Sequence, residues 1–373
     1  MHEIVRYDPG LKEQIARVQR HLWSEDLGLN TAYFEWKYEQ NPYGKVPHLH
    51  VAISEGRVVG MRGMFGACWE VGSPPRRVLA PCADDFVIDP EHRNKSLGGV
   101  IMRAAATDSA LGDYEYAFNL SPGPVTFMSG LVAGWRPVGS MRPVRRTSAR
   151  SDLVDRMAAR LKKMPLVWRY SDPLVRSYHR GLGVFRALDR RGRRVRASSE
   201  VRLEVAPPAA AMAELVARLG HDGRIRHVRD ETYLRWRYRD PLHDYRFLVR
   251  GADRLQGYLV LQAHRVDAER GVRIVDWEAT TPEIRTELLR AALEWGHFPE
   301  VNAWTASLAS ETSDSLARVG FVPTSSGSQL RGAAPILIRP VGRTATTADP
   351  TIEGRRLLDP TNWDMRMIYS MGG

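Results

Sequence analysis

The chain has 373 residues, of which 43% are hydrophobic and 26% are charged, so it can bury cores for two or three soluble domains. No apolar run approaches the roughly 18 residues that span a membrane, and the first residues lack the apolar region of a secretory signal, so we expect a cytoplasmic protein without membrane insertion. The two cysteines, Cys68 and Cys82, form no CxxC pair, which excludes a disulfide scaffold and a cysteine zinc finger. The net charge of +11 suits an anionic ligand.

Residues 1–145 predict a mixed α/β domain in which strands and helices alternate. Apolar and polar residues alternate on both sides of a short glycine-containing turn, and two later segments have apolar residues on one helical face. The expected elements are a hairpin at 48–63, strands at 78–88 and 114–120, and helices at 97–111 and 125–133.

The loop between the strand at 78–88 and the helix at 97–111 is basic and contains glycine. The first amide N–H groups of a helix lack intrahelical acceptors and carry partial positive charge, so a loop that enters a helix can hold a phosphate. Gly98 and Gly99 leave room for a ligand beside the backbone, while Arg93 and Lys95 add positive charge. These residues predict phosphate binding, with an ordinary strand–turn–helix connection as the alternative.

The segment VIDPEHRNKSLG, residues 87–98, resembles the acetyl-CoA loop of GCN5-related N-acetyltransferases, whose motif is Arg/Gln-x-x-Gly-x-Gly/Ala. Arg93, Ser96 and Gly98 occupy the three defined positions of this motif. Ser96 departs from it, since the family has glycine there, and a positive φ angle at serine would be strained.

Two further segments, FEWKYEQNP at 34–42 and LLDPTNWDM at 357–365, are similar to the same family, the second to its bacterial tandem-domain members. The resemblance implies a mixed α/β (α+β) fold with two tandem domains, each a central, mostly antiparallel sheet flanked by helices. It also implies acetyl-CoA as the co-substrate. The residues that it assigns to this cofactor are Phe86, Val87, Ile88, Arg93, Asn94, Lys95, Ser96, Leu97, Gly98, Gly99, Asn119 and Ser129.

Acetyl transfer to an amine requires a base for the amine proton and an acid for the leaving thiolate. In this family the base is often a carboxylate on the strand before the phosphate loop, where Asp84 and Asp85 stand; in a regular strand they face opposite sides. The family's usual acid is a tyrosine, but Gly130 occupies its position here. His48 and His50 share a strand face without a third ligand at a useful spacing, so we expect no metal site.

Residues 146–200 predict a basic helical connector. The stretch 142–196 holds 17 Lys and Arg against 4 Asp and Glu, which exceeds the net excess of the whole chain. Such a stretch could lie along an RNA backbone, or it could be a solvated basic surface.

Residues 201–373 predict a second, similar domain. YFEWKY at 33–38 recurs as YLRWRY at 233–238, and a hairpin pattern follows each copy, which favours a duplication. At the place of the phosphate loop this half has no glycine, and Glu283 and Glu287 put negative charge there. We therefore expect it to bind no coenzyme A and to complete the acceptor pocket or brace the first half.

The loop and the resemblance together predict an N-acyltransferase that moves an acetyl group from acetyl-CoA to the amine of a small molecule, such as an amino sugar or another metabolite. One alternative is a Fem-type transferase that uses aminoacyl-tRNA, which would make tRNA a partner. The other is a non-catalytic acyl-CoA-binding or interaction protein. The loop motif argues against the tRNA-dependent enzyme, whereas Ser96 and the missing tyrosine favour the non-catalytic protein.

Overall fold

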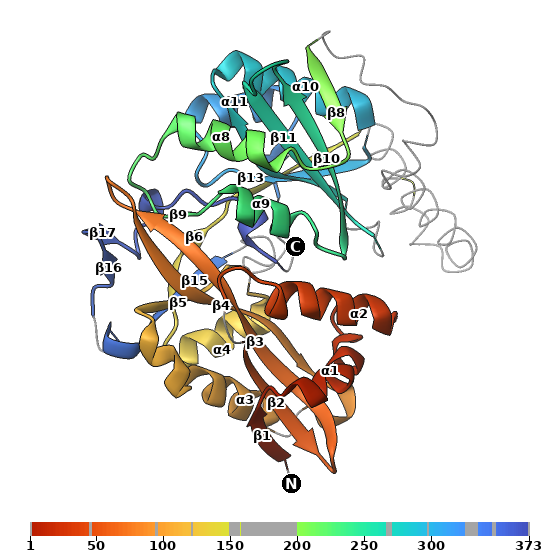
Figure 1. The fold of residues 1–373 in the computed structure, drawn as a ribbon, viewed down its shortest axis with the longest axis vertical. Coiled ribbons are helices and arrows are strands. Elements are labelled where there is room, and N and C mark those ends of the chain that lie inside the picture. Colours follow the sequence, from red (N-terminus) through yellow and green to blue (C-terminus); the bar gives the residue numbers. More distant parts are fainter. Residues whose placement is uncertain are drawn as a thin grey trace.

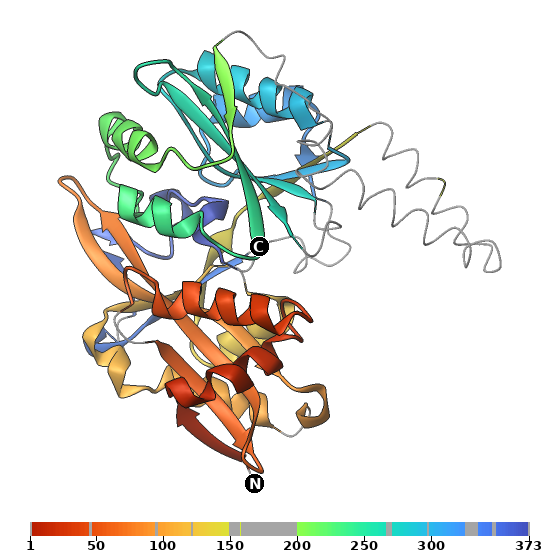
Figure 2. The same cartoon turned by 45° about the vertical axis from the view of Figure 1, so that its right-hand side comes forward.

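The protein has two lobes, which lie one above the other in Figure 1 and in the turned view of Figure 2. The N-terminus lies at the far end of the first lobe, and the C-terminus lies where the lobes meet. None of the described helices has both the length and the apolar character to cross a membrane. The structure, a computed structural model, describes residues 2–44, 47–93, 96–120, 122–148, 157, 200–265, 271–296, 298–324, 335–344 and 348–371.

The first lobe is built on one sheet, in which the neighbours β4 and β5 are parallel and the other neighbours are antiparallel. Met64 and Phe65 of β3 face opposite sides of this sheet, where Met64 joins the core that includes Ala105 and Phe65 the core that includes Ile15. Helices therefore cover both faces. In spatial order the strands are β1 (His2–Arg6), β2 (His48–Ser54), β3 (Arg57–Val71), β4 (Arg76–Ile88), β5 (Tyr116–Asn119), β15 (Pro335–Pro340) and β6 (Arg136–Ser140), and the α-helices are α1 (Lys12–Gln19), α2 (Leu27–Phe34), α3 (Leu97–Ala106) and α4 (Pro124–Val132).

The second lobe repeats this plan, with β12 and β13 as its parallel pair. Leu259 of β11 packs in the core of α10, whereas Val260 packs with Leu215 of α8 on the other face. In spatial order its strands are β14 (Val322–Pro323), β7 (Pro143–Thr147), β13 (Glu300–Trp304), β12 (Val272–Ala279), β11 (Gly257–His264), β10 (His243–Arg250) and β8 (Val201–Glu204). Its α-helices are α8 (Ala209–Leu219), α9 (Glu231–Arg237), α10 (Pro282–Gly296) and α11 (Ser310–Arg318).

Short elements complete the fold. β9 (Arg226–His227) pairs with β3 and so links the lobes. A small ribbon consists of β16 (Thr351–Ile352) and β17 (Arg355–Arg356). The remaining helical turns are η1 (Pro9–Leu11), η2 (Glu35–Glu39, of π type), η3 (Pro90–His92), η4 (Ser109–Asp113), η6 (Gly342–Thr344), η7 (Pro360–Asn362) and η8 (Met367–Tyr369).

Each lobe takes one strand from the other half of the sequence. β15 lies between β5 and β6 of the first lobe, where Ile338 stands opposite Phe118. Figure 1 shows this strand, coloured blue, among the orange and yellow strands of that lobe. β7 lies between β13 and β14 of the second lobe, where Arg146 stands opposite Val301. Each sheet is therefore complete only when both halves of the chain are present.

The predicted fold class, two mostly antiparallel sheets flanked by helices, is confirmed. The predicted domain boundaries, 1–145 and 201–373, give the order of the lobes along the chain. They do not assign every strand to its lobe, because β15 belongs to the first lobe and β7 to the second. Of the predicted connector 146–200, only residues 146–148, 157 and 200 are among the described residues.

The expected helix at 97–111 is shorter than predicted. α3 ends at Ala106, and Asp108 then accepts a hydrogen bond from the backbone of Ala110 (2.9 Å) at the start of the separate turn η4. An aspartate in this position caps a new turn instead of continuing a helix, because its side chain competes for backbone N–H groups.

The C-terminal segment lies between the lobes and bonds to both copies of the sequence repeat. The Tyr33 hydroxyl donates a hydrogen bond to the carbonyl of Met371 (3.1 Å), and the Tyr233 hydroxyl donates one to the carbonyl of Ile368 (3.3 Å). The repeated tyrosines thus hold one shared segment at the lobe junction.

Candidate active site

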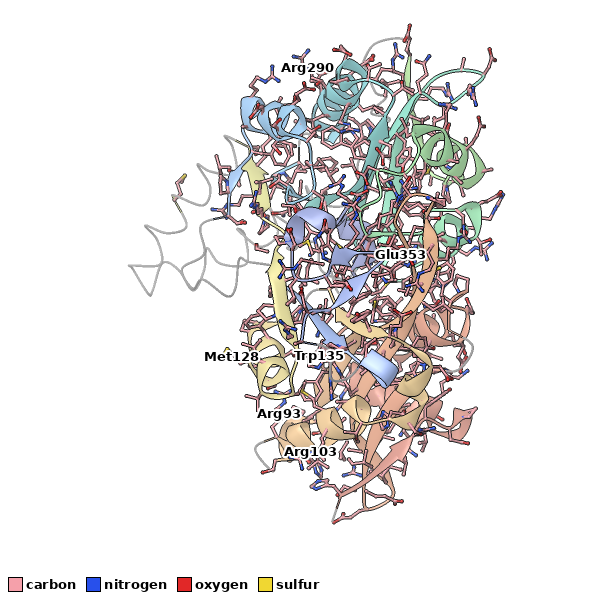
Figure 3. The ribbon with its side chains drawn as sticks, turned by 90° about the vertical axis from the view of Figure 1, so that its left-hand side faces the viewer. Arg93, Arg103, Met128, Trp135, Arg290 and Glu353 are labelled. Atoms are coloured by element: carbon pink, nitrogen blue, oxygen red, sulfur yellow. The ribbon has the colours of Figure 1, made fainter. Side chains whose placement is uncertain are left out.

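A groove with a volume of about 890 Å³ lies between α3 and α4 of the first lobe. β4 and β5 pair at one register position, Cys82 with Phe118, and the end of β4 beyond it borders the groove. Figure 3 shows Arg93, which follows η3, and Arg103, in the body of α3, in the same lobe as Met128 of α4. The groove thus occupies the place where the sequence predicts a phosphate-binding loop.

Most of the predicted cofactor residues line this groove. They are Phe86, Val87, Ile88, Arg93, Ser96, Leu97, Gly98, Gly99 and Ser129. Asn119 does not line it but is buried at the end of β5. The predictions for Asn94 and Lys95 concern residues outside those that the structure describes.

The start of α3 has the features that an anion needs. Ser96 is the N-cap residue but caps no backbone N–H with its side chain, and the first turn contains no acidic residue. A Cβ atom at Gly99 would meet no atom within 4 Å, so this side of the helix is open. At Gly98 a Cβ would lie 3.2 Å from Phe86, which explains the need for a small residue there. The first N–H groups of α3 therefore remain available for a ligand.

Ser96 has a φ angle of 58°, in the left-handed region that glycine adopts without strain. The family motif has glycine at this position, and a residue with a side chain is destabilised there by roughly 1–2 kcal/mol. Ser96 thus has a conformation that favours glycine, at the position where the family motif has glycine.

The charge of the groove is positive. Its described lining includes three arginines, Arg93, Arg103 and Arg339, and His21, but neither Asp nor Glu. Arg93 is oriented by a hydrogen bond from its Nε to the carbonyl of Ile88 (3.1 Å). Arginine side chains and free helix N–H groups are the donors that phosphates prefer, so these residues fit a phosphate-bearing coenzyme.

The sequence did not identify Arg339, His21 or Leu22 as residues of the groove. Arg339 belongs to β15, which the strand exchange brings into the first lobe. His21 and Leu22 follow α1 and reach the groove from the first half. No local pattern in the sequence links these residues to the loop, since only the folded chain brings them together.

The two candidate bases, Asp84 and Asp85, do not face opposite sides of β4 as predicted. The pairing of β3 and β4 shifts by one residue here, because Arg62 pairs with Phe86 whereas Gly63 pairs with Asp84. Asp85 is the extra residue of this bulge and has a φ angle of 47°. Both carboxylates consequently reach the same buried ammonium, that of Lys37, with Nζ–O distances of 2.8 and 2.9 Å.

Lys37 lies in an aromatic enclosure. Its Nζ is 5.1 Å from the ring centre of Tyr33, and the rings of Trp23, Tyr38 and Phe65 surround it at 5.5 to 5.6 Å. Burial opposes the charged form, but the two aspartates outweigh it, so the pKa of Lys37 is raised. The lysine is therefore a fixed positive charge behind the two carboxylates.

The two aspartates differ in access. The Asp85 side chain is fully buried and accepts a hydrogen bond from Tyr38 (2.8 Å), for which Gly63 leaves the space, since a Cβ there would lie 2.1 Å from the Tyr38 hydroxyl oxygen. Burial raises the pKa of Asp85. The Asp84 side chain is 21% exposed. Asp84 is thus the more exposed of the two, although neither aspartate lines the groove.

Gly130, which the sequence places at the position of the family's acid, is a residue of α4. This glycine is buried, and a Cβ there would lie 2.9 Å from Leu337 of the exchanged strand. Among the described residues that line the groove there is no tyrosine. The described lining of the groove therefore offers no phenol hydroxyl at this position.

His48 and His50 lie apart from this groove and have partners. His48 Nε2 is 3.1 Å from the Tyr114 hydroxyl, and His50 Nε2 is 3.4 Å from Asp108. Burial lowers the pKa of both imidazoles. The described residues contain no group of three or more His, Cys, Asp or Glu that could hold a metal ion.

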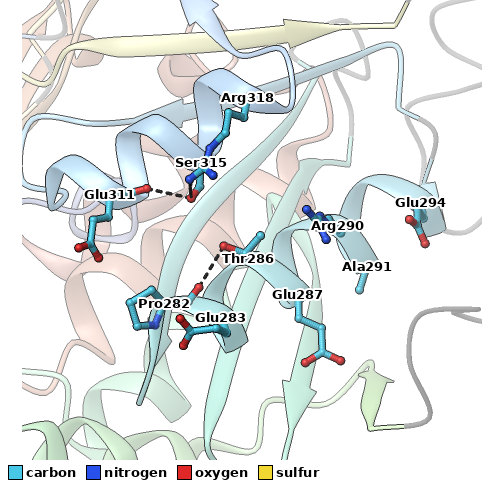
Figure 4. Close-up of a pocket in the computed structure, with 10 residues that line it drawn as sticks. All are labelled: Pro282, Glu283, Thr286, Glu287, Arg290, Ala291, Glu294, Glu311, Ser315 and Arg318. Carbon is cyan, nitrogen blue, oxygen red and sulfur yellow. Dashed lines mark hydrogen bonds between the residues drawn. The ribbon is translucent and has the colours of Figure 1, made fainter.

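The second lobe has a groove of about 660 Å³ at the equivalent place, between α10 and α11. Figure 4 shows the side chains that line it, with three glutamates on α10 and one on α11. The charged residues are four glutamates, Glu283, Glu287, Glu294 and Glu311, and two arginines, Arg290 and Arg318. This excess of negative charge would repel a phosphate. That the second half binds no coenzyme A stays a prediction.

The fold is shared with solved acetyltransferase structures. A GCN5-related N-acetyltransferase from Anabaena variabilis superimposes with a TM-score of 0.54 at 14% identity, over 91% of this chain and 73% of that one. One from Kribbella flavida gives a TM-score of 0.50 at 15% identity, over 92% and 72%. No protein-family model and no curated protein sequence matches the chain. The predicted resemblance in fold to this superfamily is thus confirmed.

Proposed function

We propose that this protein is an N-acyltransferase that binds acetyl-CoA in the groove between α3 and α4 and acylates the amine of a small molecule. The observation that carries the proposal is the lining of the groove, where three arginines and the uncapped start of α3 meet without a carboxylate among the described residues. The acetyltransferase folds of Anabaena variabilis and Kribbella flavida support it. When bound, the coenzyme would supply an activated thioester.

Residues of the loop and of β4 would hold the coenzyme. The open N–H groups of Leu97, Gly98 and Gly99, with the Arg93 guanidinium, would bind its diphosphate. The end of β4, from Phe86 to Ile88, would pair through its backbone with the extended arm. Fixing donor and acceptor next to each other supplies much of the rate in a transfer between two substrates.

Asp84 would receive the proton of the acceptor amine. Of the two aspartates at the bulge, it is the one that is partly exposed, and its Oδ2 is held by Lys37 while Oδ1 accepts the backbone N–H of Asp85 (2.9 Å). Asp85, enclosed by Lys37 and Tyr38, would position Lys37 and maintain the bulge. The C-terminal half of the chain would brace the first lobe, since it contributes β15 to the first sheet.

Calorimetric titration with acetyl-CoA tests the coenzyme site. We expect the wild type to bind, and Gly99→Glu to weaken binding at least tenfold, or about 1.4 kcal/mol, because the new carboxylate enters an open, positively charged groove. The matched control is Thr286→Glu, which adds the same charge to the groove of the second lobe. A wild type that releases no heat, or two variants that behave alike, would contradict the proposal.

Thiol release during an amine screen tests the chemistry. We expect Asp84→Asn to lower kcat about 10²-fold or more and to leave the affinity for acetyl-CoA unchanged, as expected for a base. The control is Asp113→Asn, which removes an exposed carboxylate of η4, an element apart from the bulge of β4. Binding of acetyl-CoA without thiol release for any amine would favour a non-catalytic protein.

A further inference from the structure

Arg339 lies in the groove although it belongs to the C-terminal half of the sequence. It is a residue of the exchanged strand β15 and pairs with Ala117 of β5. Leu337, two residues earlier on the same face, packs in the core shared with Ala105 of α3 and Trp135 after α4. Arg339 therefore points toward the helices, and it lines the groove together with Met102 and Ser129 and other residues of α3 and α4.

The guanidinium of Arg339 has no polar partner among the residues that the structure describes. Its Nη1 is buried without a hydrogen bond, and no ion pair involves it. Burial lowers the pKa of Arg339, and no carboxylate counteracts this effect. Arg339 is half-buried, and its buried Nη1 is unfavourable because it loses water and gains no hydrogen bond in return.

The second lobe shows how the corresponding side chain can be satisfied. Arg146 lies on the other exchanged strand, β7. It stands two residues after Val144, an apolar residue that packs on the helix side of its sheet, as Arg339 stands two residues after Leu337. Its Nε donates a hydrogen bond to the carbonyl of Val319 at the end of α11 (2.8 Å). Arg146 thus has a partner within the protein, whereas Arg339 faces a groove.

We propose that Arg339 binds a phosphate group of the ligand in the first groove, so that the C-terminal half of the chain completes the coenzyme site of the first lobe. Arginine binds phosphate with two parallel hydrogen bonds, which would satisfy the guanidinium and add to the charge of Arg93 and Arg103. This inference deepens the proposed function and rests on it for the identity of the ligand.

The test uses the full chain and two ligands, coenzyme A and inorganic pyrophosphate, with affinities from calorimetry and melting temperatures from thermal unfolding. The variants are Arg339→Gln, Arg339→Lys and, as the matched control, Arg146→Gln. We expect Arg339→Gln to weaken coenzyme A binding about tenfold and to reduce the ligand-induced rise in melting temperature. The affinity of Arg339→Lys should lie between those of Arg339→Gln and the wild type, since lysine keeps the positive charge but cannot form two parallel hydrogen bonds. Arg146→Gln should bind as the wild type does.

The outcomes separate this inference from the proposed function. Equal affinities of the wild type and Arg339→Gln for both ligands would overturn the role of Arg339 and leave the coenzyme site intact. A wild type that binds pyrophosphate but not coenzyme A would overturn the proposed function, while a loss of pyrophosphate binding in Arg339→Gln would still support the phosphate contact. A wild type that binds neither ligand would overturn both.

Discussion

Trp36 and Trp236, two hundred positions apart in the sequence, stack on each other and exchange a pair of hydrogen bonds. Their ring centres are 4.9 Å apart with planes inclined by 13°. The Nε1 of each indole donates to the backbone carbonyl of the other tryptophan, at 2.8 Å in both directions. The sequence repeat is thus a contact between its own two copies, related by a local twofold arrangement at the junction of the lobes.

This pair should contribute strongly to stability, because both rings are buried. We expect Trp36→Ala to lower the free energy of unfolding by about 3–5 kcal/mol, the usual effect of removing a large buried aromatic side chain. Urea denaturation of the two Trp→Ala variants and of the double variant checks this prediction. The double variant should lose less than the sum of the single losses, and strict additivity would argue against an energetic coupling of the two rings.

The repeat could be predicted from the sequence, but the strand exchange could not. The repeat is carried by adjacent residues with the same spacing in both copies. β7 and β15, in contrast, would be extended strands in whichever sheet they joined. Which sheet each strand joins depends on contacts with residues far away in the sequence, so a local pattern does not reveal it. Arg339 was missed for this reason, since its role depends on the lobe to which β15 belongs.

The exchange predicts that the halves do not fold alone. A fragment of residues 1–148 would lack β15, which separates β5 from β6, and a fragment of residues 200–373 would lack β7. Each fragment would then expose strand edges that pair with other chains. We expect each to be aggregated or without a cooperative unfolding transition, and the two to form a folded complex when they are co-expressed. Gel filtration and thermal unfolding measure this, and a monomeric fragment that unfolds cooperatively would contradict it.

The left-handed conformation of Ser96 leads to a prediction about the loop. Ser96→Gly relieves the strain but adds freedom to the unfolded chain, so we expect the free energy of unfolding to change by less than about 1 kcal/mol. Ser96→Val should destabilise by roughly 1–3 kcal/mol, since a β-branched residue at this φ angle is strongly disfavoured. Calorimetry should show that the glycine variant binds acetyl-CoA at least as well as the wild type. Tighter binding by the valine variant would contradict the assigned role of the loop.

The arrangement of the aspartates shows a second limit of the sequence. The presence of two carboxylates before the loop is visible in the sequence, but their orientation depends on the bulge between β3 and β4. A bulge arises from the pairing of two strands, whereas the alternation rule uses only one of them. The identity of the buried cation, Lys37, also depends on packing, since it lies on a different element.

His227 predicts how stability depends on pH. The imidazole is fully buried, its Nδ1 lies 2.7 Å from the carbonyl of Val228, and its Nε2 lies 3.4 Å from the backbone N–H of Cys68, which fits a neutral ring that donates at Nδ1 and accepts at Nε2. Burial is the main reason why its pKa falls from 6.5 to about 3.

Because the unfolded chain takes up this proton near pH 6.5 and the folded chain only near pH 3, stability is fully present above pH 6.5 and is lost as the pH falls toward 3. The contribution of one proton is about 1.4 kcal/mol per pH unit within this range. In urea denaturation from pH 7 to pH 4, the stability of the wild type should fall more steeply than that of His227→Phe, by about 1.4 kcal/mol per pH unit, although the variant should be less stable at pH 7. If stability depended on pH equally in the wild type and in His227→Phe, His227 would take up no proton on unfolding, which would contradict the prediction.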